Sequence, residues 1–212
     1  IQARRMKIGP MPTSPSRRSD DPQPLHQRAA SDLSFIRETM ARAVPMTSVP
    51  GWGGVLMGVT ALVAALLAST RTDPAEWLAV WLAEAVLALG IGGIAVVRKA
   101  ERTGTTMLSH AGRQFMGNFV PPLVAGALLT PVLYGAGLRG HLPGLWLLMY
   151  GTAVITAGAF SIRVVPLLGG LLMLVGAVAL IVAPAWGDLL MAIGFGGLQI
   201  GFGLLIARKY GG

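Results

Sequence analysis

Six long, continuous runs of apolar residues constrain this chain more than any other feature. They cover residues 51–69, 77–97, 115–135, 143–160, 164–183 and 188–207. Each is close to the roughly 20 residues that an α-helix needs to cross the hydrocarbon layer of a bilayer. Apolar and polar residues do not alternate within them, which argues against transmembrane β-strands. The sequence therefore predicts an all-α, polytopic membrane protein with six transmembrane helices.

The shortage of charged residues supports this prediction. Of the 212 residues, 53% are hydrophobic and only 12% are charged, whereas soluble domains carry about 25% charged residues. We therefore expect lipid to surround the helices. The chain has no cysteine, which excludes disulfides, thiolate catalysis and Cys-based metal sites. Its histidines, His26, His110 and His141, lie far apart in the sequence, so we predict no metal site and no cofactor.

The first 48 residues differ from the rest of the chain. Residues 1–30 are rich in Pro, Ser and Arg and poor in bulky apolar side chains, so we predict a disordered basic tail. The chain begins with Ile1, and Met6 and Met11 are alternative initiators. In residues 31–48 apolar side chains recur at helical spacing, which predicts an amphipathic juxtamembrane helix followed by a linker. This helix either lies along the lipid surface or docks onto a protein partner.

The distribution of basic residues predicts the orientation. All but two of the 17 Lys and Arg residues fall in the N-terminal flank, the connections after the second and fourth runs, and the C-terminus; the exceptions are Arg71 and Arg139. Because basic flanks stay in the cytoplasm, we predict a multi-pass protein of the bacterial inner membrane with both termini cytoplasmic. The net charge of +8 then also favours anionic headgroups. The basic tail has no interleaved aromatic residues, which argues against nucleic-acid binding.

The six-helix domain, residues 49–212, divides into three helical hairpins at 49–99, 120–163 and 164–209. Each hairpin begins near a Val-Pro pair, turns near a proline followed by a tryptophan, and ends near a basic residue. Proline suits a helix start, tryptophan suits the headgroup layer, and cations suit helix C-termini and the inner leaflet. The shared pattern predicts an internal threefold repeat of parallel hairpins. Unrelated hairpins would acquire the same residues for the same reasons, so convergence stays an alternative.

Small residues indicate the expected packing surfaces. Gly54 and Gly58 in the first helix, and Gly197 and Gly201 in the last, have the four-residue spacing that lets helix backbones approach closely. The glycine-rich run GFGGLQIGFG at 194–203 does not predict a phosphate-binding loop, because no strand precedes it and it lies at membrane depth. We expect these glycines to pack helix against helix.

Glu84 is the leading candidate for a functional residue, because no other carboxylate lies well inside a predicted span. An ionisable side chain there costs roughly 2.5–3.5 kcal/mol on insertion scales and suggests a function by default. With other polar side chains at similar depth it is expected to form a layer, either as an interhelical network worth about 0.6 kcal/mol per bond or as a proton or solute site. The simpler explanation is the network. The layer comprises Glu84, Thr60, Thr130, Tyr150, Thr152 and Gln199.

Four stretches carry a resemblance to a known group of proteins: FIRETMARA at 35–43, VPGWGG at 49–54, WLAVWLAEAVLAL at 77–89 and PAWGDLLMAIGFGGLQIGFGLLIARKYGG at 184–212. They resemble a family of uncharacterised bacterial six-helix integral membrane proteins. Members are often encoded beside winged-helix transcriptional regulators, so the resemblance implies a membrane component of a sensing or stress-response unit. It carries no catalytic motif and therefore assigns no catalytic residue.

The predicted function follows from this inventory. Glu84 has no second carboxylate at its depth, so we predict no catalytic residues and no enzyme. We predict a non-enzymatic inner-membrane protein with a regulatory, sensory or scaffolding role, which acts through lipid or through a protein partner at its N-terminal segment. The alternative is a small-solute or proton-coupled transporter or channel that uses the polar layer around Glu84. The sequence leaves homo-oligomerisation open.

Overall fold

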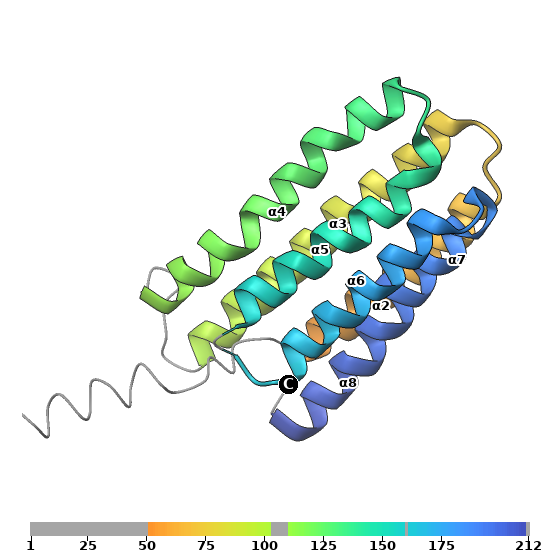
Figure 1. The fold of residues 1–212 in the computed structure, drawn as a ribbon. Helices are drawn as coiled ribbons and strands as arrows, with labels where there is room; N and C mark the ends of the chain where they lie inside the picture. The colour runs from red at the N-terminus through yellow and green to blue at the C-terminus, as the bar shows by residue number, and fades with distance from the viewer. Residues whose placement is uncertain (1–50, 103–109, 160, 211–212) are drawn as a thin grey trace, which may run out of the picture. The chain divides into compact units, whose positions relative to one another are not determined.

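The computed structural model of the chain describes residues 51–102, 110–159 and 161–210, and every element in these ranges is helical (Figure 1). The all-α prediction is therefore confirmed for this part of the chain. The described residues all belong to one compact unit. The predictions for residues 1–48, namely a tail, an amphipathic helix and a start site, lie outside the described residues.

Helices follow one another closely along the chain. The last helix changes geometry along its length but is continuous from residue 187 to 210, and we call it the C-terminal helix. Its middle turns are π-helical. The elements are α2 (Gly51–Ser69), α3 (Pro74–Arg102), α4 (His110–Gly135), a 3₁₀ turn η1 (Arg139–His141), α5 (Leu142–Gly158), α6 (Val164–Ile181), a 3₁₀ turn η2 (Pro184–Trp186), and the C-terminal helix, formed by α7 (Gly187–Met191), the π segment η3 (Ala192–Leu198) and α8 (Gln199–Tyr210).

Within the described residues, five helical segments are long and apolar enough to cross a membrane, so the chain is a helical membrane protein. The sixth, α5, has 17 residues and ends at Gly158, which corresponds to about 26 Å of helix. It is shorter than the run predicted at 143–160. The five segments are Gly51–Ser69, Pro74–Lys99, Gly112–Gly135, Val164–Ile181 and Pro184–Lys209.

The second predicted hairpin begins earlier than the sequence suggested. Its predicted start at residue 120 lies inside α4, which begins at His110 and continues through Pro121, Pro122 and Pro131. A proline inside a helix lacks the N–H that would bond the carbonyl four residues earlier. The carbonyl that Pro122 leaves free is that of Asn118, and it lies 2.9 Å from Thr156 Oγ1 of α5, whose single proton it shares with the Thr152 carbonyl at the same distance. A neighbouring helix therefore satisfies the backbone, as membrane helices require.

The helices pack in an open chain of neighbours rather than a closed ring. The C-terminal helix packs on both α2 and α6, while α5 packs on both α4 and α6. The two remaining helices, α3 and α4, each have one main partner, α2 and α5 respectively. A closed threefold ring of hairpins would also require α3 to pack along α4, and within the described residues these two helices share no extensive contact. The threefold repeat therefore stays a prediction.

The two ends of the helices carry different residues. The connections after α2, α4 and α6 all lie at one end, at the right of Figure 1. The elements that follow these connections carry Trp77, Trp146 and Trp186 near their starts. We call this end the tryptophan end. The opposite end carries basic residues such as Arg163 and Arg208, and we call it the basic end. Trp52, in the first turn of α2, lies at the basic end, so tryptophans occur at both ends of the helices, as is typical of a membrane-crossing bundle.

Glycines bring α5 and α6 into direct backbone contact. Gly151 and Gly169 face each other, and a Cβ atom added to either would lie 2.7 Å from the carbonyl oxygen of the other. Gly144 and Gly176 form a second facing pair, with corresponding distances of 2.9 and 3.1 Å. In each helix the two glycines are seven residues apart, which is about two turns. We call this contact the α5–α6 seam.

The same arrangement joins α2 to the C-terminal helix. A Cβ added to Gly51 would lie 2.7 Å from the carbonyl oxygen of Gly203, and one added to Gly203 would lie 2.8 Å from that of Gly51. Gly58 and Gly196 are the second pair, with a distance of 2.8 Å from a Gly58 Cβ to the Gly196 oxygen. The spacing within each helix is again seven residues. We call this contact the α2–C-terminal seam.

The predicted packing glycines only partly coincide with these seams. Gly58 lies in a seam, and Gly54 makes an ordinary contact, 3.5 Å from an added Cβ to the Gly203 Cα. Gly197 and Gly201 lie on an exposed face of the C-terminal helix, and no atom approaches an added Cβ at Gly201 within 4 Å. The pairing recurs every two turns rather than every turn, so the seven-residue spacing, not the four-residue one, selects the packed glycines.

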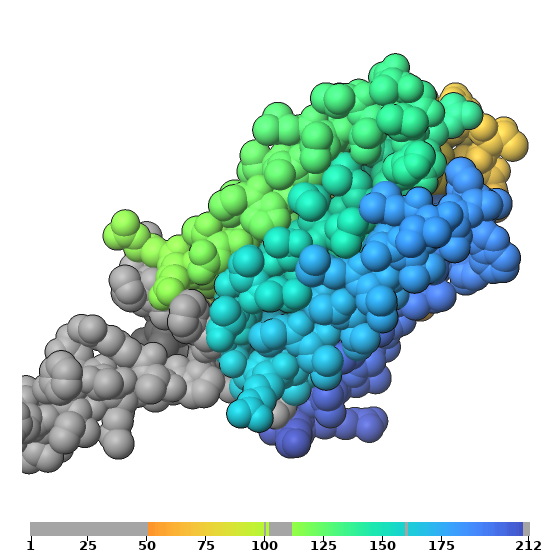
Figure 2. Space-filling view, in the orientation of Figure 1, coloured from red at the N-terminus to blue at the C-terminus, as the bar shows by residue number. Residues whose placement is uncertain are grey.

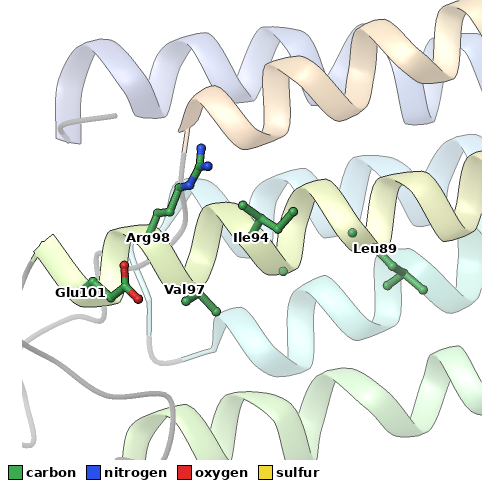
Figure 3. A pocket seen from close by; sticks show the side chains of 7 residues that line it. Leu89, Ile94, Val97, Arg98 and Glu101 are labelled. Atoms are coloured by element: carbon green, nitrogen blue, oxygen red, sulfur yellow. The ribbon is translucent and has the colours of Figure 1, made fainter.

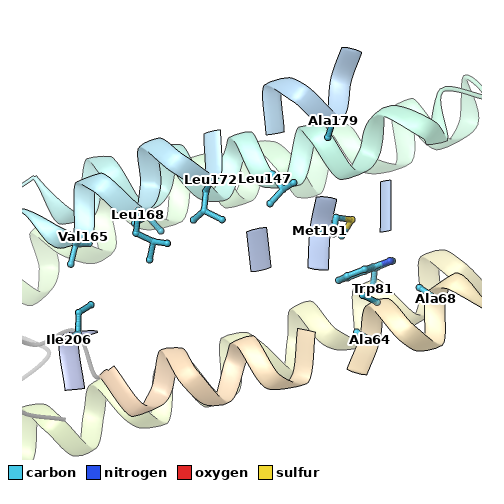
Figure 4. Packing of buried hydrophobic residues seen from close by; sticks show 12 residues of the cluster. Ala64, Ala68, Trp81, Leu147, Val165, Leu168, Leu172, Ala179, Met191 and Ile206 are labelled. Atoms are coloured by element: carbon cyan, nitrogen blue, oxygen red, sulfur yellow. The ribbon is translucent and has the colours of Figure 1, made fainter. Parts of the chain in front are cut away.

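The buried core lies where these helices meet. Leu147, Leu172 and Met191 are fully buried, and Trp81 of α3 reaches the same cluster (Figure 4). The outward faces are apolar as well. Val86 of α3 is 72% exposed and Leu128 of α4 is 67% exposed, and Figure 2 shows α4 along one edge of the bundle. Large apolar side chains on outward faces are compatible with contact to a lipid bilayer.

Candidate functional site

Glu84 faces the contact between α3 and α2. Its carboxyl oxygen Oε1 accepts a hydrogen bond of 2.8 Å from Thr60 Oγ1, and the residue is only 8% exposed. The same Thr60 hydroxyl lies 2.9 Å from the carbonyl oxygen of Met57. This geometry ties the carboxyl group to the neighbouring helix rather than aiming it into an open space.

Gln199 and Tyr150 form a second polar pair, between the C-terminal helix and α5. Gln199 Nε2 donates a hydrogen bond of 2.6 Å to the Tyr150 hydroxyl, and Gln199 is only 6% exposed. Phe119 and Phe195 meet the Tyr150 ring edge-on, with centroid distances of 6.1 and 5.5 Å. Gln199 directly follows the π segment. The pair is enclosed by aromatic side chains.

The last two predicted polar residues bond within or next to α5. Trp146 Nε1 donates to Thr130 Oγ1 at 2.9 Å, and that hydroxyl donates to the Gly126 carbonyl at 2.8 Å. Thr152 Oγ1 donates to the Leu148 carbonyl at 2.8 Å. Both threonines thus return a hydrogen bond to their own helix, as hydroxyl side chains in helices commonly do.

The six predicted residues are therefore joined in local pairs rather than through one shared network. Glu84 meets Thr60, Gln199 meets Tyr150, and Thr130 meets a tryptophan that the prediction did not include. Within the described residues, no buried side-chain nitrogen or oxygen lacks a hydrogen-bond partner. A polar group inside a membrane protein is costly unless it is paired, and local pairing meets that requirement without a ligand.

A second polar site lies at the tryptophan end, centred on Asp188. Its Oδ1 atom accepts hydrogen bonds from the indole nitrogens of Trp77, at 2.8 Å, and Trp81, at 3.1 Å. The Trp77 ring is also stacked on that of Trp146, with centroids 5.7 Å apart and planes inclined by 8°. Asp188 therefore links the start of the C-terminal helix to α3, and Trp77 continues the link to α5.

A cavity of about 190 Å³ opens beside this cluster. Residues from three connections line it, including Arg71 and Asp73 after α2, Arg139 in η1, and Asp188 after η2. Arg71 pairs with Glu76 at 3.4 Å, and both side chains are about half exposed, so this ion pair holds the arginine weakly. Arg139 forms no ion pair within the described ranges. We call this the tryptophan-end cavity.

A larger hollow follows one face of α3 toward the basic end. It has a volume of about 520 Å³, and the described residues that line it, from Leu89 to Glu101, all belong to α3 (Figure 3). It is wide open and mostly apolar, with Arg98 and Glu101 as its charged side chains. One exposed helix face does not position several groups around a ligand, so we place no site there.

The sequence pattern did not predict the tryptophan-end cavity. Asp188 is not singled out by the sequence pattern, and Arg71 and Arg139 stand out only as exceptions to the distribution of basic residues. A usable signal was present nonetheless. All three charges, together with Pro-Trp pairs, fall on the same predicted side of the membrane, so their connections must share one surface.

In the described part of the chain, no three His, Asp or Glu side chains are grouped so that they could hold a metal ion. The chain was also compared with protein-family models, curated proteins and solved structures, and none of them matches. Function must therefore be argued from the residues themselves.

Proposed function

We propose that this chain is a non-enzymatic protein of the bacterial inner membrane with a scaffolding or sensory role, and that it works through lipid or a protein partner. The observation that carries the proposal is the local pairing of its interior polar groups. Glu84 is bonded to Thr60 and Tyr150 to Gln199, so these groups stabilise helix contacts instead of lining a continuous polar path. Two glycine seams fit a rigid platform better than a moving gate.

The proposed topology places the tryptophan end outside the cytoplasm and the basic end inside, with α5 crossing the membrane as the fourth of six helices. The charge distribution supports this orientation. The chain contains no cysteine, so single cysteines report position without background. We expect Thr72→Cys to react with a membrane-impermeant maleimide in intact cells, and Thr103→Cys to react only after permeabilisation. The reverse labelling pattern would overturn the proposed orientation.

The proposed role depends on residues 1–44 as the segment that recruits a partner. Deleting them is expected to abolish co-purification of that partner, while the membrane-embedded helices still purify as a folded, monodisperse species in detergent. Replacing the eight arginine and lysine residues of the segment with glutamine provides a matched control that keeps its length. If both variants co-purify the same proteins as the intact chain, recruitment through this segment is wrong.

The alternative prediction, a transporter or channel that uses Glu84, is not adopted. Glu84 faces a helix contact, and the hollow along α3 begins at Leu89, beyond the Glu84 position.

A further inference from the structure

The tryptophan-end cavity brings together charges that the sequence separates by more than a hundred residues. Arg71 and Arg139 are the two basic residues that the predicted topology places away from the cytoplasm, and both line this one cavity. Asp73 and Asp188 line it as well, so two positive and two negative side chains surround the same space. Such a balance suits a ligand that carries both charges better than a simple anion or cation.

The carboxylates of Asp73 and Asp188 are each held by hydrogen bonds to one oxygen, Oδ1. Asp188 Oδ1 is occupied by the indole N–H groups of Trp77 and Trp81. Within the described residues its Oδ2 accepts no hydrogen bond and is not a buried unpaired atom, and Asp188 lines the cavity. Asp73 uses Oδ1 to cap the start of α3 through the Ala75 N–H at 2.9 Å. Asp188 is thus held rigidly while one of its oxygens remains available.

The surrounding side chains match a cation on one side and an oxyanion on the other. Trp77 lines the cavity together with Asp188 and holds Asp188 Oδ1 through its indole N–H, and a carboxylate fixed in this way favours an ammonium group. The guanidinium groups of Arg71 and Arg139 present paired donors, which suit a phosphate. The volume of about 190 Å³ is below the roughly 300–1,000 Å³ of drug-sized sites, so the ligand must be compact.

We propose that the tryptophan-end cavity binds a phosphoethanolamine group, with Arg71 and Arg139 on the phosphate and Asp188 Oδ2 on the primary ammonium. The group is available from two sources: a free solute, or the headgroup of a phospholipid at the depth where tryptophans lie. Binding at this cavity goes beyond the proposed role, and measuring it neither uses nor tests the N-terminal segment.

The test uses the full chain in detergent and isothermal titration with O-phosphoethanolamine. We expect saturable binding, and weaker binding by about tenfold or more for inorganic phosphate or ethanolamine alone, since each satisfies half of the site. Arg139→Gln and Asp188→Asn are each expected to lower the affinity by about tenfold or more. The side-chain oxygen in Asp188→Asn still accepts hydrogen bonds from the two indoles, so we expect this variant to keep its fold. Arg113→Gln, at the basic end, is the matched control and leaves binding unchanged.

A second arm identifies the source. The chain is reconstituted in nanodiscs of mixed phosphatidylethanolamine, phosphatidylcholine and phosphatidylglycerol, and retained lipids are read by native mass spectrometry. Selective retention of phosphatidylethanolamine that Arg139→Gln abolishes assigns the lipid headgroup, and binding in the titration alone assigns a free solute. The proposal is overturned if phosphate alone binds as tightly as O-phosphoethanolamine, if the two variants bind like the wild type, or if neither arm shows selective binding.

Discussion

The glycine seams and the two peripheral helices show two different ways of holding a helix in place within a membrane. In the α5–α6 and α2–C-terminal seams, facing glycines bring backbone against backbone over several turns. The peripheral helices α3 and α4 have one main partner each and present large apolar side chains outward. They pack on these partners through side chains rather than glycine backbones, and the contacts include the hydrogen-bonded pairs Glu84 with Thr60 and Thr130 with Trp146.

The difference follows from the solvent. Lipid tails are as apolar as leucine, so burying an apolar side chain between helices gains little, and close packing becomes the main source of association. A seam without Cβ atoms maximises that packing and cannot accommodate a side chain. Losing one side-chain hydrogen bond between helices lowers the stability of a membrane protein by only about 0.6 kcal/mol. Substitutions should therefore be far more damaging in the seams than in the peripheral contacts.

The largest expected effect comes from filling the α5–α6 seam. Gly169→Leu places a side chain where the Gly151 carbonyl oxygen already lies 2.7 Å from an added Cβ, and should lower the free energy of unfolding by about 3 kcal/mol or more. Gly170 is its neighbour and has open space around an added Cβ, so Gly170→Leu should change stability by less than about 0.5 kcal/mol. Denaturant unfolding in detergent measures both, and equal losses would refute the seam.

Removing the acceptor at the tryptophan end ranks second. Asp188→Ala leaves the Trp77 and Trp81 indoles without their shared acceptor, which should cost about 2 kcal/mol of unfolding free energy. Asp188→Asn keeps an oxygen in place and should cost less than about 1 kcal/mol. The same unfolding assay, read by tryptophan fluorescence, compares them. If alanine and asparagine behave alike, the hydrogen bonds to the indoles do not attach α3 to the C-terminal helix.

The third effect concerns the proline-interrupted backbone of α4. Thr156→Val removes the donor to the Asn118 carbonyl, and an unpaired carbonyl next to lipid should cost about 1 kcal/mol. Thr156→Ser keeps a hydroxyl and should be close to neutral. Thermal unfolding in detergent separates the two variants. Equal melting temperatures for valine and serine would mean that another group, such as water, satisfies this carbonyl.

These contacts explain why the sequence predicted the helices but not their arrangement. Length and apolarity are local properties, so all six runs are found as helices. The partner of the Asn118 carbonyl lies 38 residues away, so the sequence near Pro121 and Pro122 did not show that the second hairpin begins before residue 120. The packed glycines also required a partner. A four-residue pair such as Gly197 and Gly201 looks as suitable as Gly196 and Gly203 until the facing helix is known.

The smallest expected effect lies at Glu84, and it bears most directly on function. Gln retains the oxygen that accepts the Thr60 hydrogen bond, so Glu84→Gln should alter the free energy of unfolding by about 0.6 kcal/mol or less. If Glu84 belongs to a peripheral attachment, the substitution should also leave proton flux unchanged in vesicles that carry a pH gradient and an internal pH-sensitive dye.

The flux measurement decides between the two functions because its variants remove the charge of Glu84 separately from its hydrogen bond to Thr60. Glu101→Gln removes an exposed carboxylate at the basic end and controls for the loss of one negative charge. Glu84→Leu removes the hydrogen bond as well as the charge. A proton flux that the wild type shows, that Glu101→Gln keeps and that Glu84→Gln abolishes would replace the scaffolding role with transport. Equal flux in the wild type and Glu84→Gln, with a stability loss confined to Glu84→Leu, would make Glu84 a membrane-embedded attachment of α3 to α2.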